Sequence, residues 1–86
     1  TRPGILERFE IDPENSIVEV IVPQAFHHKT IVELDLRNKY GLTLLAVSQE
    51  ENPGKFEINP SPVARLRAGS VMVVIGSNKG IDRLPV

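Results

Sequence analysis

Two adjacent histidines, His27 and His28, are the side chains in this sequence that most readily suggest metal chemistry. Adjacent side chains point apart in helices and strands alike, and no third ligand is spaced nearby, so the pattern indicates a solvated loop rather than a zinc site. An unperturbed imidazole titrates near pH ~6.5, so pH sensing stays open for either histidine. We predict no metal site here.

Acidic residues gather around a predicted hairpin. Glu50 and Glu51 precede its turn, and Glu57 lies across it. A calcium loop alternates oxygen ligands along the chain, which this segment does not, so we interpret the carboxylates as solvated. The chain has no cysteine, no serine in a Gly-x-Ser-x-Gly elbow and no carboxylate pair that stands apart from turns and helix faces. We predict that it is not an enzyme and has no catalytic residue.

The glycine-containing segment 76–80, GSNKG, suggests a phosphate loop only in part. It follows an apolar run, but it lacks the Walker spacing and the Lys-Ser/Thr ending. We interpret it as the start of a helix whose first turn is capped by Ser77 or Asn78. Arg65 and Arg67 precede the same apolar run, and we favour a solvated surface over an anion site for both.

Composition limits the class of protein. The 86 residues are 41% hydrophobic and 24% charged, with a formal net charge of -1, which is typical of one small globular domain, here assigned to residues 1–86. No run of like charges exists, so we predict no nucleic-acid partner. The longest apolar run, Val71–Ile75, is too short to cross a bilayer, which predicts no direct membrane insertion and a cytoplasmic location.

Hydrophobic periodicity predicts five strands. Phe9 and Ile11 alternate with charged neighbours in a half-buried first strand, and Asp12–Asn15 forms the turn after it. The other strands are predicted at residues 17–22, 42–47, 55–58 and 71–75, with 42–47 and 55–58 joined as a hairpin and a short helical turn at 77–84.

The main helix is predicted to begin at Thr30. Thr30 and Glu33 have the spacing of a capping box, in which each side chain bonds the backbone N–H of the other residue. Gly41 suits the left-handed residue that ends a helix. The apolar residues do not form one stripe, so the helix either stops near Leu36 or packs against two surfaces.

Three predicted strands, 17–22, 42–47 and 71–75, are apolar on both faces. Both faces of such strands need cover, and one short helix cannot supply it. A monomer would expose a larger apolar patch than soluble monomers usually carry. We therefore predict a homodimer or a complex with another subunit.

The string EINPSPVARLRAGSVMVVIG at 57–76, preceded in order by SIVEVIVP and KTIVELDLRNKYGLTLLAV, resembles the C-terminal (TrkA-C-like) lobe of the RCK family. These proteins are cytoplasmic regulators of potassium channels and of Trk/Ktr-type potassium uptake systems. The resemblance implies an α+β fold with a small mixed sheet, a β-hairpin and one main helix. It also implies a dimer that sits beside a nucleotide-binding Rossmann lobe, within a ring that gates a membrane potassium channel or transporter.

No Gly-x-Gly-x-x-Gly motif occurs in this chain. The resemblance therefore implies that the Rossmann lobe is fused in a longer parent or supplied by a separate subunit, and we assign neither NAD nor ATP to this chain. Some members of the family bind cyclic di-AMP between two C-terminal lobes. The resemblance maps that pocket onto Ala46, Val47, Ser48, Ile58, Asn59 and Pro60.

The mapped residues suit a nucleobase in part. Asn59 precedes a proline, so an extended and rigid turn is expected, and its amide can both donate and accept at a base edge. Ile58 and Pro60 offer apolar faces for an adenine. Cyclic di-AMP-binding relatives often carry a basic residue where this chain has Glu50 and Glu51, and two carboxylates disfavour a phosphodiester.

We therefore predict a domain that senses a ligand, dimerises and gates potassium transport. One alternative is a structural assembly module without a small-molecule ligand, in which the Asn-Pro-Ser-Pro turn is only a rigid connector. Another is the same lobe regulating a different cation or amino-acid transporter. A sensor gains thermal stability from its ligand, whereas an assembly module does not.

Overall fold

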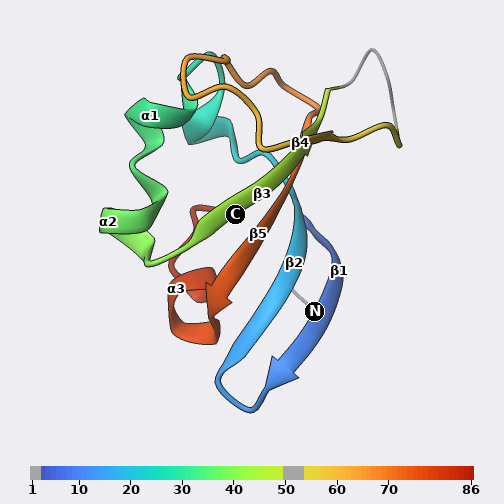
Figure 1. Cartoon of the computed structure of the whole chain (residues 1–86), viewed down its shortest axis with the longest axis vertical. Coiled ribbons are helices and arrows are strands. Elements are labelled where there is room, and N and C mark those ends of the chain that lie inside the picture. Colours follow the sequence, from blue (N-terminus) through green and yellow to red (C-terminus); the bar gives the residue numbers. More distant parts are fainter. Residues whose placement is uncertain (1–2, 50–53) are drawn as a thin grey trace.

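The computed structural model describes residues 3–49 and 54–86, which form one five-stranded sheet with short helices (Figure 1). The strands are β1 (Ile5–Asp12), β2 (Asn15–Ile21), β3 (Thr43–Ser48), β4 (Glu57–Ile58) and β5 (Val71–Ser77). The helices are the 3-10 turn η1 (Gln24–Phe26), α1 (Ile31–Leu34), α2 (Leu36–Tyr40) and α3 (Asn78–Asp82). The predicted α+β class is confirmed.

The strand order is β1-β2-β5-β3-β4, and every described neighbour pair is antiparallel. The sheet is therefore antiparallel where a mixed sheet was expected. The reason is the position of β5, which inserts between β2 and β3 and separates the two strands that run in the same direction. The predicted hairpin is present, because Ala46 pairs with Ile58 and Val47 with Glu57.

The core lies on one face of this sheet. Alternate residues of β2 and β5 point into it and are fully buried, and the helices and the loop before β5 cover them. The buried cluster is centred on Val18, Val20, Leu34, Leu36, Leu42, Leu66, Met72, Val74 and Ile81. We call this the inner face, and the opposite side of the sheet the outer face.

The first hairpin turns at Asp12–Asn15, as predicted. The Asp12 carboxylate accepts the backbone N–H groups of Glu14 at 2.8 Å and Asn15 at 2.9 Å. These bonds favour the charged form, so the Glu14 N–H and then the Asn15 side chain hold the pKa of Asp12 below its usual value. The turn is therefore held by a local side chain.

The expected half-burial of the first strand is wrong for this chain. Phe9 is 67% exposed and Ile11 is 47% exposed. The strand lies at the edge of the sheet, and these two side chains are open to solvent there. Alternation along a strand indicates two different faces, but it does not show whether anything covers the apolar one.

The capping box at the start of the main helix is confirmed. Thr30 donates its backbone N–H to the Glu33 carboxylate at 2.8 Å, and Glu33 donates its backbone N–H to the Thr30 hydroxyl at 3.2 Å. The helix is then divided at Asp35, which has a φ of 50°. Because of this break, Leu34 of α1 and Leu36 of α2 both point into the same core. This explains why the apolar residues of the segment do not form one stripe along a single helix.

The end of β5 passes directly into α3. The Ser77 hydroxyl accepts the Gly80 N–H at 3.0 Å, so the predicted N-cap is confirmed. Gly80 lies against the end of α2, where an added Cβ would stand 2.2 Å from the Tyr40 carbonyl oxygen. Glycine at this position therefore lets the last helix dock on the main helical segment.

Candidate functional site

The outer face carries a continuous row of side chains across the middle of the sheet. Directly paired residues of antiparallel strands point to the same side. The register places Glu19 of β2 opposite Val73 of β5, Val73 opposite Ala46 of β3, and Ala46 opposite Ile58 of β4. This row reaches from the first hairpin to the opposite edge of the sheet.

A bulge in β3 decides which of the predicted ligand residues belong to this row. The register shifts between Leu44 and Ala46, so Ala46 and Ser48 point to the outer face while Val47 points into the core. Val47 is 4% exposed and packs with the inner cluster. Val47 therefore has a structural role in the core. Ala46 and Ser48 form the floor of the outer face near β4, and they are also buried, at 4% and 3% exposed.

The returning strand and its turn stand beside that floor. Ile58 is 69% exposed, Asn59 is exposed and Pro60 is half-buried. The Asn59 backbone N–H donates to the Leu45 carbonyl at 3.0 Å, which anchors the turn to β3. These three residues form an accessible ledge at the β4 edge, which we call the β4 ledge.

The backbone of the ledge differs from the expectation. Asn59 has a φ of 50°, so it lies in the left-handed region and not in the extended region favoured before proline. Asparagine tolerates this region better than most residues. The turn is held by the hydrogen bond from the Asn59 N–H to the Leu45 carbonyl of β3, and not by extended geometry at Asn59.

The chain after the ledge is joined to the start of the main helix. Leu66 makes two backbone hydrogen bonds with the segment just before α1. Its carbonyl accepts from the His28 N–H at 2.7 Å, and its N–H donates to the Lys29 carbonyl at 3.0 Å. Ile31 donates to Ala64 at 3.1 Å. These bonds pair residues 64–66 with residues 28–31 in an antiparallel arrangement. The pairing fixes the position of the β4 ledge relative to α1.

Arg65 strengthens the same junction. Its Nη1 donates to the His28 carbonyl at 2.7 Å and lies 3.7 Å from the Glu33 carboxylate. The capping bonds from Thr30 are the main cause that lowers the pKa of Glu33, and the nearby charges of Arg65 and Lys29 add to them. The two partners are largely exposed, so the ion pair itself adds little stability. Arg65 therefore acts within the fold, beyond the solvated surface that was expected.

The end of β3 is fixed by Gln49. Its side-chain oxygen accepts a short hydrogen bond from the Ser70 hydroxyl, and its Nε2 donates to the Arg65 carbonyl at 3.4 Å. Ser70 is fully buried. The predicted acidic pair at 50–51 lies outside the described residues.

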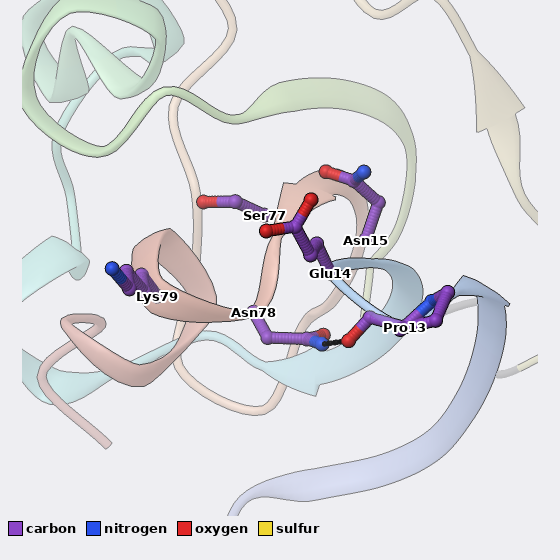
Figure 2. A pocket seen from close by; sticks show the side chains of 6 residues that line it. All are labelled: Pro13, Glu14, Asn15, Ser77, Asn78 and Lys79. Carbon is purple, nitrogen blue, oxygen red and sulfur yellow. Dashed lines mark hydrogen bonds between the residues drawn. The ribbon is translucent and has the colours of Figure 1, made fainter.

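A separate open groove of about 350 Å³ lies where the first hairpin meets α3 (Figure 2). It is lined by Pro13, Glu14, Asn15, Ser77, Asn78 and Lys79. Figure 2 shows the Asn78 amide directed at the Pro13 carbonyl, to which it donates at 3.2 Å.

Asn78 also accepts two hydrogen bonds on its side-chain oxygen. The Ser16 hydroxyl donates at 2.7 Å and Arg8 Nη1 donates at 3.1 Å. Sequence reasoning placed Asn78 only at a helix start and missed that it joins β1, β2 and α3. No local pattern indicates such a contact, because its partners lie more than 60 positions away.

Metal-ligating side chains do not gather in threes among residues 3–49 and 54–86. The rings of His27 and His28 have centroids 6.3 Å apart at 76° to each other, and His27 Nε2 lies 3.2 Å from the Val22 carbonyl oxygen. Within the same residues, none of the helices has the length and apolar character required to cross a bilayer.

Comparison with known proteins identifies relatives of this architecture. Residues 16–84 match the model of the TrkA-C domain. The Ktr system potassium uptake protein A of Bacillus subtilis (strain 168) is 32% identical over 80 residues, and protein C of the same system is 32% identical over 82 residues. Each alignment covers 93% of this chain and 35% of the relative, so the chain spans about a third of these proteins.

Solved structures agree with that similarity. The RCK C domain of the potassium transport protein KtrA, in complex with cyclic diadenosine monophosphate, is 28% identical with a TM-score of 0.73. That alignment covers 83% of this chain and 80% of the solved one. The RCK_C domain dimer of Streptococcus agalactiae BusR with c-di-AMP is also 28% identical, with a TM-score of 0.64 over 76% of this chain and 79% of that one. The sheet, the hairpin and these matches together show that this chain belongs to the TrkA-C domain family.

Proposed function

We propose that this chain is a regulatory lobe of a Ktr-type potassium uptake system or a potassium channel. The observation that carries the proposal is the TrkA-C match over residues 16–84. The similarity to two Ktr potassium uptake proteins supports it. In this proposal residues 1–86 act in the cytoplasm, beside a Rossmann-type RCK N-terminal lobe and a membrane transporter, in a ring that gates ion passage.

The ligand site of this lobe is the β4 ledge with the adjoining floor of β3. The exposed Ile58 and the half-buried Pro60 supply apolar faces, and Asn59 supplies an amide beside them. Ala46 and Ser48 lie on the same side of the sheet, and they are only 4% and 3% exposed, so the accessible part of this site is the β4 ledge itself. A flat base can lie on this surface with its polar edge toward Asn59. Cyclic di-AMP is the ligand of two structural relatives and the first candidate.

The site becomes enclosed when two copies meet. The floor at Ala46 continues through Val73 to Ile17 and Ile75 on the outer face, all apolar and none of the last three fully buried. A homodimer that covers this face removes an apolar surface from water and places two ledges near each other. Ligand binding between them would then favour one dimer arrangement, and that difference in affinity is what moves a gate.

The test is calorimetric titration of the 86-residue chain with cyclic di-AMP, with ATP and calcium as comparisons. We expect saturation at one cyclic di-AMP per two chains. Ile58→Ala and Asn59→Ala should each weaken binding by roughly tenfold, which corresponds to about 1.4 kcal/mol. Leu6→Ala is the matched control, because Leu6 is also an exposed aliphatic residue, at 50%, but on the opposite edge strand.

An assembly module without a ligand is the second candidate. It is favoured by Glu50 and Glu51, which follow β3 where a phosphodiester would need positive charge. Absence of binding heat for all three compounds, with a dimer still present by light scattering, would overturn the sensor and support this module. The same lobe on another cation or amino-acid transporter would retain the dimer and would be distinguished by its genomic neighbour.

A further inference from the structure

The edge strand β1 is uncovered along most of its length. Every residue from Leu6 to Asp12 is exposed, and β1 pairs with β2 on one side only. An edge strand presents backbone N–H and C=O groups that can pair with another strand. Register shifts between Ile5 and Glu7 and between Glu10 and Asp12 confine the regular ladder to its central part. A partner strand would therefore pair mainly with residues 7–10 of β1.

The central tripeptide is complementary to itself. Arg8, Phe9 and Glu10, read against an antiparallel copy centred on Phe9, place each arginine opposite a glutamate and the two phenylalanines opposite each other. Opposite charges and aromatic pairs at directly facing positions stabilise a sheet. A register shifted by one residue places Glu7 opposite Glu10 and Arg8 opposite Phe9, which loses both charge pairs and adds two like-charge pairs.

The side chains are placed for this contact. Phe9 is 67% exposed on the outer face, opposite Ile17 of β2, so a second phenylalanine would cover an apolar ring now in water. Arg8 and Glu10 lie on the inner side of the strand, paired with Val18 and Ser16. Arg8 uses Nη1 to reach Asn78, and a guanidinium has further donors for a carboxylate.

We propose that β1 is a docking edge for a second copy of this chain, joined antiparallel in the register centred on Phe9. The contact continues the sheet across two copies through a two-fold axis at Phe9. It is separate from the β4 ledge, which lies on the opposite edge of the sheet. Two distinct two-fold contacts on one chain link more than two copies, which is what an extended or ring-shaped assembly requires. The edge contact itself needs no ligand and does not rest on the proposed function, whereas the link between more than two copies also requires the homodimer proposed above.

Single cysteine substitutions test the register, because the chain has no cysteine of its own. Phe9→Cys should form a disulfide-linked dimer under mild oxidation, because facing Cβ atoms lie within about 4.5–5.5 Å and small shifts reach disulfide geometry. Ile11→Cys is the control, since Ile11 would face Glu7 and stand four residues from its own copy. We expect at least fivefold more covalent dimer from Phe9→Cys on a non-reducing gel.

A mixture of two cysteine variants distinguishes association through the β1 edge from association through two outer faces. Arg8→Cys and Glu10→Cys lie on the inner side, so only edge pairing brings them together, and an equimolar mixture should cross-link several-fold faster than either variant alone. In the Phe9→Cys background, Glu10→Arg should suppress cross-linking, and adding Arg8→Glu should restore it. Equal yields for Phe9→Cys and Ile11→Cys, or no restoration by the double reversal, would overturn the proposal.

Discussion

Replacement of Asn78 should destabilise the chain more than is usual for a residue that is only partly buried, because its side-chain amide joins β1, β2 and α3. Asn78→Ala removes the acceptor of the Ser16 hydroxyl, which is fully buried, and leaves that hydroxyl without its partner at 2.7 Å. An unsatisfied buried polar group costs about 1–3 kcal/mol. The bonds to Arg8 and Pro13 are exposed, so their loss adds no more than about 0.5 kcal/mol each. We expect a total loss near ~2 kcal/mol.

The assay is urea or thermal unfolding at fixed protein concentration, so that association does not shift the midpoint. For a domain of this size 1 kcal/mol corresponds to roughly 4–8 °C, so the melting temperature should fall by about 8–16 °C. Asn38→Ala is the matched control. Its amide makes an exposed bond to Asp35 at 2.9 Å, and we expect a change below about 0.5 kcal/mol.

A double substitution tests the reason for the loss. Ser16→Ala combined with Asn78→Ala removes donor and acceptor together, so no buried hydroxyl is left unsatisfied. The pair should therefore be less destabilising than the sum of the two single variants by about 1 kcal/mol. Additive effects, or an Asn78→Ala loss no larger than that of Asn38→Ala, would refute the account of this junction.

Three further predictions concern single positions. Gly80→Ala should lower the free energy of unfolding by about 1–3 kcal/mol or prevent folding, because its Cβ would stand 2.2 Å from the Tyr40 carbonyl oxygen. Gly41 has open space around it but a φ of 68°, so Gly41→Ala should lower the same free energy by about 1 kcal/mol in the same unfolding assay. Glu33 has a lowered pKa, so its stabilisation is present above its ordinary value of 4.5 and is lost as pH falls through the lower folded value; Glu33→Gln should flatten that acid-side decline, and an unchanged slope of stability against pH would contradict it. Asn59→Gly should retain stability at a φ of 50°, whereas Asn59→Val should lose about 1–2 kcal/mol by chemical denaturation; equal midpoints would show that the turn relaxes.

Features that depend on a few neighbouring residues were predictable. The Thr30–Glu33 capping box, the turn held by Asp12 and the cap made by Ser77 each use hydrogen bonds within three positions of the chain. Such bonds form wherever the local backbone allows, so residue type and spacing are sufficient. Gly41 is similar, because the left-handed end of the helix depends on that residue alone.

Features that depend on distant neighbours were not predictable. The run LTLLAV indicated a strand, but the bulge between Leu44 and Ala46 decided that Val47 joins the core and that Ala46 faces outward. Phe9 alternates correctly, yet its exposure follows from the edge position of its strand. In both cases the apolar pattern was real and only the sheet order or register showed which partner each side chain meets.

Residue types and their spacing were enough to predict the α+β class, the order of the strands along the chain, the helix caps and the family to which this chain is similar. Long-range packing was needed to show the place of β5 between β2 and β3, the division of the helix at Asp35, the outer-face row that reaches Ile58, and the Asn78 junction. The difference is one of range. Caps and turns depend on interactions between residues close together in the sequence. Strand register, edge position and contacts over more than 60 positions depend instead on which strands pack together.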